Sequence, residues 1–170
     1  MLFQSLIHAY LSCMNQPQIP LPPSQIAVNA QYIKDFSFES PNAPQIFGPV
    51  EKAPELTMGV NVRTRPVNDG RSHEVLLMLK LEAKLKDKTA FIAELTYGGI
   101  FTLPSVPEDQ LKVLLLIECP RLLFPFARAI LADAVRDGGF PQILIAPIDF
   151  AALYQANKNN IGAMTAAGAA

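Results

Sequence analysis

The sequence contains few of the residues on which enzyme and metal chemistry depend. Its 170 residues include no tryptophan, two cysteines (Cys13 and Cys119) and two histidines (His8 and His73). Two cysteines are too few for a disulfide scaffold, and these four residues show no metal-ligand spacing. The sequence also lacks a nucleophile elbow, a phosphate-binding glycine loop, a dinucleotide fingerprint and an H-E-x-x-H motif. It therefore predicts a protein with no metal, no cofactor and no catalytic activity, in a reducing, cytoplasmic compartment.

Charge is scarce as well, and neither sign is in excess. Lys and Arg number 14 and Asp and Glu number 15, so the net charge is −1 and charged residues make up 17% of the chain. Without a basic excess, the composition argues against a nucleic-acid partner. No apolar run reaches the roughly 18 residues that cross a bilayer, so stable membrane insertion is not expected. Half of the residues are apolar, which is enough for one domain with a full core.

The two ends differ in composition from the rest of the chain. Residues 1–24 combine an apolar start with a proline-rich stretch, which we interpret as an extension and tether outside the domain. The start lacks a preceding basic residue and a following cleavage site, which favours an extension with Met14 as the functional start over a secretion signal. Residues 158–170 form an Ala/Gly tail that we expect to be disordered. The domain is then expected to span 25–157.

Period-two alternation in the first half predicts strands, because successive strand side chains face opposite sides. The predicted strands cover 32–39, 55–65, 72–86 and 89–103. Short turns, including Asp87-Lys88, join the later runs and predict antiparallel pairing with one solvated face. The longer segment 41–54 is predicted to be a crossing loop that carries Phe47.

The sequence also predicts which side chains of the first strand face the core and where the last strand is irregular. In the first strand, Tyr32, Phe36 and Phe38 share one side, with Phe36 and Phe38 expected in the core; Asp35 and Glu39 on the other side are expected to face water. The pair Gly98-Gly99 in the last strand is expected to mark a bulge or a bend.

The second half of the domain is predicted to be helical. A helix is expected to start near Pro107-Glu108-Asp109, with acids at its positive end, and to end at Asp137-Gly138-Gly139. Pro120 and Pro125 are expected to break or kink it. Asp149 can cap a short helix over 150–157.

The stretch from Leu111 to Leu123 has almost no polar face. Such a helix is either buried or placed at a subunit contact. One four-stranded sheet cannot cover it alone, so the sequence predicts an oligomer.

Two surfaces are candidates for binding. The first holds Asp35 and Glu39 on one strand and Ile92 and Glu94 on another. This pattern suits the docking of a basic partner, with charge for steering and Ile92 for burial. It also fits an ordinary solvated strand face, since single exposed apolar residues are common.

The second surface is apolar and comes from loop-rich segments and the last helix. It could be plain core closure, or it could line a groove for extended apolar peptides, in which aromatic rings give affinity without reading sequence. Its members are Phe47, Phe140, Phe150, Leu153 and Tyr154.

Four segments resemble the SecB-type protein-export chaperones, and they occur in that family's order and spacing. The resemblance runs from Tyr32 to Tyr154 and leaves out residues 1–24 and the Ala/Gly tail. The segments are YIKDFSFESPNAP (32–44), TAFIAELTYGGIF (89–101), CPRLLFPFARAIL (119–131) and GGFPQILIAPIDFAALY (138–154).

The resemblance implies an α+β fold, a four-stranded antiparallel sheet with helices packed on one face. It further implies a homotetramer, a dimer of dimers with the helices between two outer sheets. It implies a cytoplasmic, ATP-independent holdase that keeps unfolded secretory preproteins translocation-competent and delivers them to SecA, the translocase motor. A related holdase dedicated to one partner, such as a toxin–antitoxin component, is the alternative. A small-molecule enzyme that uses His73 or Cys119 is a third hypothesis.

The resemblance also assigns roles to residues. The family's SecA-docking positions match Asp35, Glu39, Ile92 and Glu94, and all three acids are present. Its client grooves correspond loosely to the second surface. The near-neutral net charge and the N-terminal extension depart from the family, so docking is expected to depend more on the local acidic residues.

Overall fold

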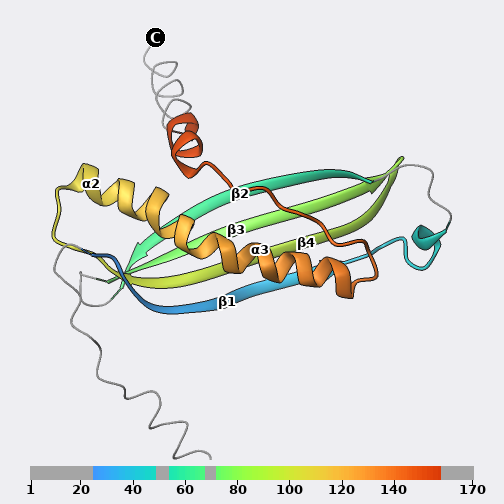
Figure 1. The fold of residues 1–170 in the computed structure, drawn as a ribbon, viewed down its shortest axis with the longest axis horizontal. Helices are drawn as coiled ribbons and strands as arrows, with labels where there is room; N and C mark the ends of the chain where they lie inside the picture. Colours follow the sequence, from blue (N-terminus) through green and yellow to red (C-terminus); the bar gives the residue numbers. More distant parts are fainter. Residues whose placement is uncertain (1–24, 49–53, 68–71, 158–170) are drawn as a thin grey trace, which may run out of the picture.

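A computed structural model describes residues 25–48, 54–67 and 72–157 of the chain (Figure 1). The predictions for residues 1–24 and 158–170 lie outside the described residues. So do parts of the crossing loop and of the turn around Asn68.

The predicted strands form a single antiparallel sheet with the order β1-β4-β3-β2. β1 starts at Ala27, earlier than the expected Tyr32. Because β1 and β2 are the two edges, the connection between them crosses from one side of the sheet to the other, and its described part contains the short helix η1. The bounds are β1 Ala27–Glu39, η1 Gln45–Phe47, β2 Glu55–Pro66, β3 Ser72–Leu85 and β4 Lys88–Thr102.

The core lies between the inner face of this sheet and a layer of helices (Figure 1). Alternation in β3 sends one set of side chains inward, and Val75, Leu77 and Leu81 have no exposed surface. Lys80 and Lys84 on the opposite side are exposed. We call this opposite side, away from the helices, the outer face. The sheet with helices on one face confirms the predicted α+β architecture.

The helical layer runs without interruption from Glu108 to Asp137. It consists of α2 Glu108–Val113, the π-helical segment η2 Leu114–Glu118 and α3 Cys119–Asp137. Of the predicted break or kink, the break is wrong, because neither Pro120 nor Pro125 ends the helix; the helix is irregular only in the π-helical segment directly before Cys119 and Pro120. Pro120 follows the π-helical turn, whose wider spacing relieves the clash that a proline ring makes with the carbonyl four residues earlier in an α-helix.

Both predicted caps are present. At the end of α3, the N–H of Gly139 donates to Arg136 and the N–H of Phe140 donates to Val135, with Gly139 at φ +86°. This pair of bonds is a Schellman motif, and the positive φ explains the glycine. Oδ1 of Asp149 accepts bonds of 3.0 Å from the N–H groups of Ala151 and Ala152, which caps the helix over 150–157.

Several details of the strands differ from the sequence-based expectations. The β3–β4 turn is Lys86-Asp87, with φ +55° at Lys86, instead of Asp87-Lys88. The register shifts lie in β1 and, in the β3–β4 pairing, between Ala83 and Lys84; none lies at Gly98-Gly99. The glycines serve close packing: a Cβ at Gly98 would lie 2.8 Å from the ring of Tyr32, and one at Gly99 would lie 2.6 Å from the ring of Phe101.

The expectation for Phe36 is only half right. Phe36 pairs with Leu95 and therefore shares the inner side of the sheet, but it is 38% exposed. The reason is that α3 packs on β4 and β3 and leaves the β1 edge open. Phe38 is partly buried and stacks on Phe91 with 5.6 Å between ring centroids.

Candidate functional site

The four residues of the first predicted surface lie together on the outer face. In the β1–β4 register, Glu39 is opposite Ile92, and Asp35 is opposite Thr96, which follows Glu94 by two residues. Opposed residues of an antiparallel pair share a face. The three carboxylates are exposed and Ile92 is partly buried. We call Asp35, Glu39, Ile92 and Glu94 the acidic patch.

A bulge in β1 shapes this part of the outer face. The register shifts between Ile33 and Asp35, so Lys34 is an extra residue without an opposed partner. An extra residue resets the alternation of the strand. As a result, Tyr32 points outward like Asp35, whereas strict alternation had placed Tyr32 on the side of Phe36.

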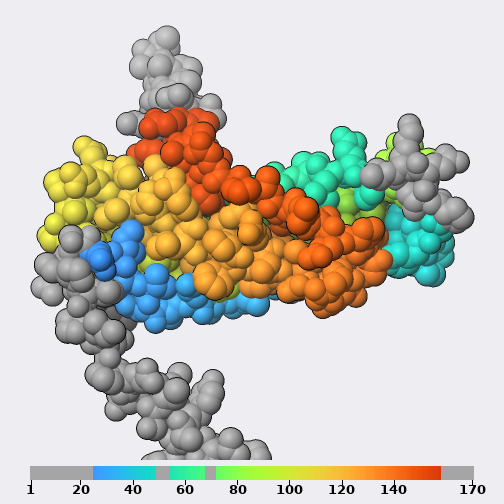
Figure 2. Space-filling view, in the orientation of Figure 1, coloured from blue at the N-terminus to red at the C-terminus, as the bar shows by residue number. Residues whose placement is uncertain are grey.

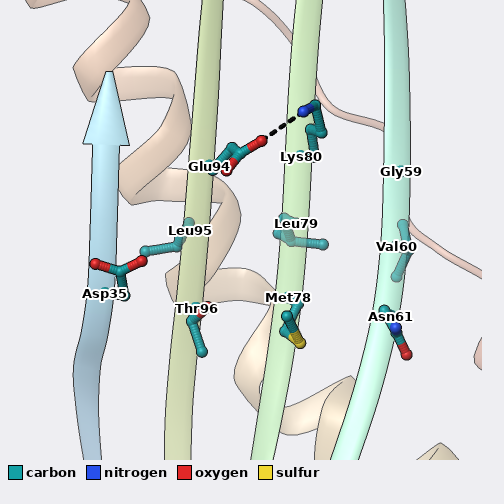
Figure 3. Close-up of a pocket in the computed structure, with 10 residues that line it drawn as sticks. All are labelled: Asp35, Gly59, Val60, Asn61, Met78, Leu79, Lys80, Glu94, Leu95 and Thr96. Carbon is teal, nitrogen blue, oxygen red and sulfur yellow. Dashed lines mark hydrogen bonds and ion pairs between the residues drawn. The ribbon is translucent and has the colours of Figure 1, made fainter. Parts of the chain in front are cut away.

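A shallow hollow of about 430 Å³ adjoins the acidic patch on the outer face (Figure 3). It extends across all four strands toward β2, where Gly59 contributes no side chain. Sequence reasoning missed it, although its outward residues follow from the alternation of β2 and β3. The lining residues are Asp35, Gly59, Val60, Asn61, Met78, Leu79, Lys80, Glu94, Leu95 and Thr96.

One wall of the hollow is an ion pair. Nζ of Lys80 donates to Oε1 of Glu94 at 2.5 Å, and both side chains are about half exposed (Figure 3). The hydrogen bond and charge of Glu94 raise the pKa of Lys80, and Glu82 and Glu39 add to this effect. Lys80 therefore lies in the negative field of the acidic patch.

A second polar cluster lies further along the outer face, and sequence reasoning missed it. The carboxylate of Glu74 is buried and accepts hydrogen bonds from Tyr32 Oη, Arg65 Nε and Lys34 Nζ. Tyr32 is opposite Gly98 of β4, which has no side chain to obstruct the tyrosine ring, and Glu74 is opposite Ile100, two residues further along β4. The cluster joins β1, β2 and β3.

The pKa values in this cluster follow from its contacts. Burial alone would raise the pKa of Glu74, but the hydrogen bonds from Tyr32, Arg65 and Lys34 outweigh it and lower the pKa to about 2. Burial and the bond to Glu74 raise the pKa of Tyr32 to about 12. Glu74 is thus a buried carboxylate that stays charged because it is fully partnered.

The structure divides the second predicted surface into two groups. Phe47 and Phe140 form the first, with 5.1 Å between ring centroids, and Phe140 also contacts Phe91 at 4.9 Å. Phe47 is 49% exposed and covers one side of this cluster. This aromatic cluster is therefore partly accessible to solvent at this end of the sheet.

The second group comes from the helix over 150–157. Leu153 and Tyr154 are partly buried against the core. Phe150 is 1% exposed and meets Phe124 edge-on at 6.1 Å, so it belongs to the core and is not available to a groove. The capped first turn of this helix points Phe150 toward α3. The extended segment 141–149 separates the two groups (Figure 1), and its Leu144 is 95% exposed.

Figure 2 shows the helical layer at the surface of the molecule, and three of its apolar side chains are exposed. Val113, Leu122 and Phe126 are 40%, 42% and 52% exposed. From Asp133 to the end of α3, the exposed positions are charged, and Arg136 forms an ion pair with Asp133. Val113 and Leu122 lie in the stretch from Leu111 to Leu123 for which the sequence predicts a buried face or a subunit contact, and Phe126 lies just beyond it.

Two general features of the described residues bear on the site. None of the helices among them is long and apolar enough to cross a membrane. Within the same ranges, no group of three or more His, Cys, Asp or Glu side chains is arranged to hold a metal ion.

Comparison with known proteins identifies close relatives. Residues 20–160 match the family model described as preprotein translocase subunit SecB. A "Protein-export protein SecB" from Azorhizobium caulinodans is 56% identical over 75% of this chain and 79% of its own length. The protein of the same name from Parvibaculum lavamentivorans is 49% identical over 86% of this chain and 85% of its own length.

A solved structure shares the fold at low sequence identity. The SecB-like chaperone of Mycobacterium tuberculosis, in complex with a ChAD peptide from the HigA1 antitoxin, has a TM-score of 0.59 and 11% identity. The match covers 82% of this chain and 91% of that chain. At this identity the likeness concerns the fold alone.

Proposed function

Because this chain belongs to the SecB family of preprotein-export chaperones, we propose that it holds unfolded secretory preproteins in the cytoplasm without ATP. We further propose that it docks on SecA through the acidic patch. The family is one of chaperones and not of enzymes. The relatives named for protein export are about half identical to this chain, which favours general export over a single dedicated toxin–antitoxin partner.

One observation carries the docking assignment: Asp35, Glu39 and Glu94 share one open sheet face around a partly buried Ile92. Exposed carboxylates attract a basic partner over a Debye length, and an apolar centre supplies burial after contact. The patch lies on the opposite side of the sheet from the helices and aromatic groups, so SecA and a client can be bound at once.

Clients are proposed to bind on the helical side, at Phe47 and Phe140 and along Leu153 and Tyr154. Half-open aromatic clusters gain affinity from ring area and do not require a particular sequence. Exposed Leu144, in the extended segment between the two groups, is an apolar contact along the same path. This arrangement suits an unfolded chain with scattered apolar residues.

We further propose that the chain forms a homotetramer, a dimer of dimers, through the uncovered part of its helical layer. The uncovered residues Val113, Leu122 and Phe126 of the helical layer form an apolar stripe that a second copy would bury. Pairing helices inward leaves the acidic patch of each chain pointing outward. The expected particle has a mass of about 74 kDa, four times 18.6 kDa.

The variant Glu94→Lys tests the docking assignment. We expect it to weaken SecA binding at least about tenfold, because it reverses one patch charge and places a second lysine beside Lys80. Binding can be measured by calorimetry with purified SecA, and client holding by aggregation of an unfolded preprotein without ATP. Holding should be unchanged. The control Asp109→Lys alters an exposed acid at the start of α2 and should affect neither. Equal SecA affinity in Glu94→Lys and the unaltered chain would remove the docking assignment.

A further inference from the structure

The hollow on the outer face and the acidic patch share two residues, Asp35 and Glu94. Between these carboxylates and β2 the hollow is lined by the apolar side chain of Met78 and by Thr96. A site with an apolar lining and carboxylates at one side suits a long cationic side chain, whose alkyl stem packs while its charged end reaches the acids.

The chain already places a cation of its own at this position. The ammonium group of Lys80 is bound to Glu94 at 2.5 Å, from the strand next to that of Glu94. Both groups are about half exposed, so solvent screens the pair and it can be exchanged for another partner. A docking lysine or arginine must compete with Lys80 for the same carboxylate.

We propose that Lys80 is an intramolecular competitor that sets the affinity of the docking face. The docked partner places one lysine or arginine in the hollow, its stem on Met78 and its charge on Glu94 and Asp35 in place of Lys80. This inference rests on the proposed docking of SecA at the acidic patch. It adds two points to that proposal. The hollow is the binding site, or seat, of one cationic side chain of the partner, and Lys80 is the residue that pairs with Glu94 before docking.

A matched pair of lysine variants tests the competition. Lys84 lies on the same strand and the same face, is similarly exposed and pairs with Glu82 at 3.1 Å. Lys80→Met and Lys84→Met remove the same charge from the same face. With purified full-length SecA, we expect Lys80→Met to bind about three- to fivefold more tightly and Lys84→Met to change by less than about twofold. Equal tightening would indicate a general charge effect, and weaker binding by Lys80→Met would make Lys80 a partner contact. Either result overturns the proposal.

Filling the hollow tests the seat without touching a charge. A Cβ at Gly59 would meet Lys80 Cβ at 3.8 Å, an ordinary contact, so a side chain there enters the hollow without a clash. We expect Gly59→Leu to weaken SecA binding about tenfold. Thr57→Leu, on the same face of β2 but outside the hollow, should bind SecA normally. Unchanged binding by Gly59→Leu would contradict the seat.

The two levels of the proposal fail differently. If Glu94→Lys binds SecA with normal affinity, docking at this face is wrong and the seat with it. If Glu94→Lys weakens binding while Lys80→Met and Gly59→Leu behave like the unaltered chain, docking stands and only the competition and the seat are wrong. Thermal melts of each variant show whether the chain remains folded.

Discussion

Replacing Glu74 with alanine is expected to lower the free energy of unfolding by about 2–3 kcal/mol. The carboxylate is buried and is the common acceptor for Tyr32, Lys34 and Arg65, from strands that are not all neighbours. Its removal leaves the tyrosine hydroxyl over Gly98 without a partner and removes a link between β1 and β2. Arg65 and Lys34 are partly exposed, so water can replace part of the hydrogen bonding that they lose when Glu74 is removed.

The measurement is a urea titration at fixed protein concentration, because association also affects apparent stability. Glu82→Ala is the matched control, since Glu82 lies on the same strand and face and pairs with the exposed Lys84. We expect it to change the free energy of unfolding by less than about 1 kcal/mol. An equal decrease in the free energy of unfolding in both variants would mean that the buried Glu74 cluster stabilises the fold no more than an exposed ion pair does.

The contribution of Glu74 should depend on pH in one direction. Its pKa is about 2 in the folded chain, below the ordinary range near 4.5. A lowered folded pKa stabilises the fold above the unfolded pKa, and the stabilisation disappears as the pH falls toward 2. The difference in unfolding free energy between the unaltered chain and Glu74→Gln should therefore shrink between about pH 5 and pH 2. A constant difference would contradict the assigned charge state.

The second large effect concerns assembly. Phe126→Glu is expected to convert the proposed tetramer of about 74 kDa into dimers or monomers. Phe126 is the most exposed member of the apolar stripe on the helical layer, and a carboxylate buried there without a partner is strongly unfavourable. Light scattering coupled to gel filtration gives the mass.

The control for this variant is Arg136→Glu. Arg136 is exposed on α3 in the charged part, where it pairs with Asp133 and Asp137. The control places the same glutamate on the same helix and should leave the particle intact. An unaltered chain that runs as a monomer, or a Phe126→Glu variant of full mass, would show that the stripe is not a subunit contact.

The sequence predicted the sheet and the acidic patch well because both depend on alternation. Val75 to Leu85 alternates strictly, and antiparallel pairing then determines that outward residues of neighbouring strands meet. The alternation of side chains along each strand was enough to place Glu94 and Asp35 on the same face of the sheet. The caps at Asp149 and Gly139 were predictable because their chemistry is local.

What the sequence did not reveal depends on single residues or on contacts distant along the chain. The bulge at Lys34 has no compositional signal, yet it turns Tyr32 to the outer face. The Glu74 cluster joins residues that only the folded sheet brings together. Phe150 could be assigned to the core only once α3 was in place above it.

The most direct test of the two-surface account is site-specific photo-crosslinking. A photoreactive phenylalanine analogue is placed either at Ile92 in the acidic patch or at Leu153 on the last helix. Each protein is then mixed with SecA and an unfolded preprotein together. The account predicts that position 92 crosslinks to SecA and not to the preprotein, and that position 153 does the reverse. Crosslinks from position 92 to the preprotein, or from position 153 to SecA, would contradict the separation of the two surfaces.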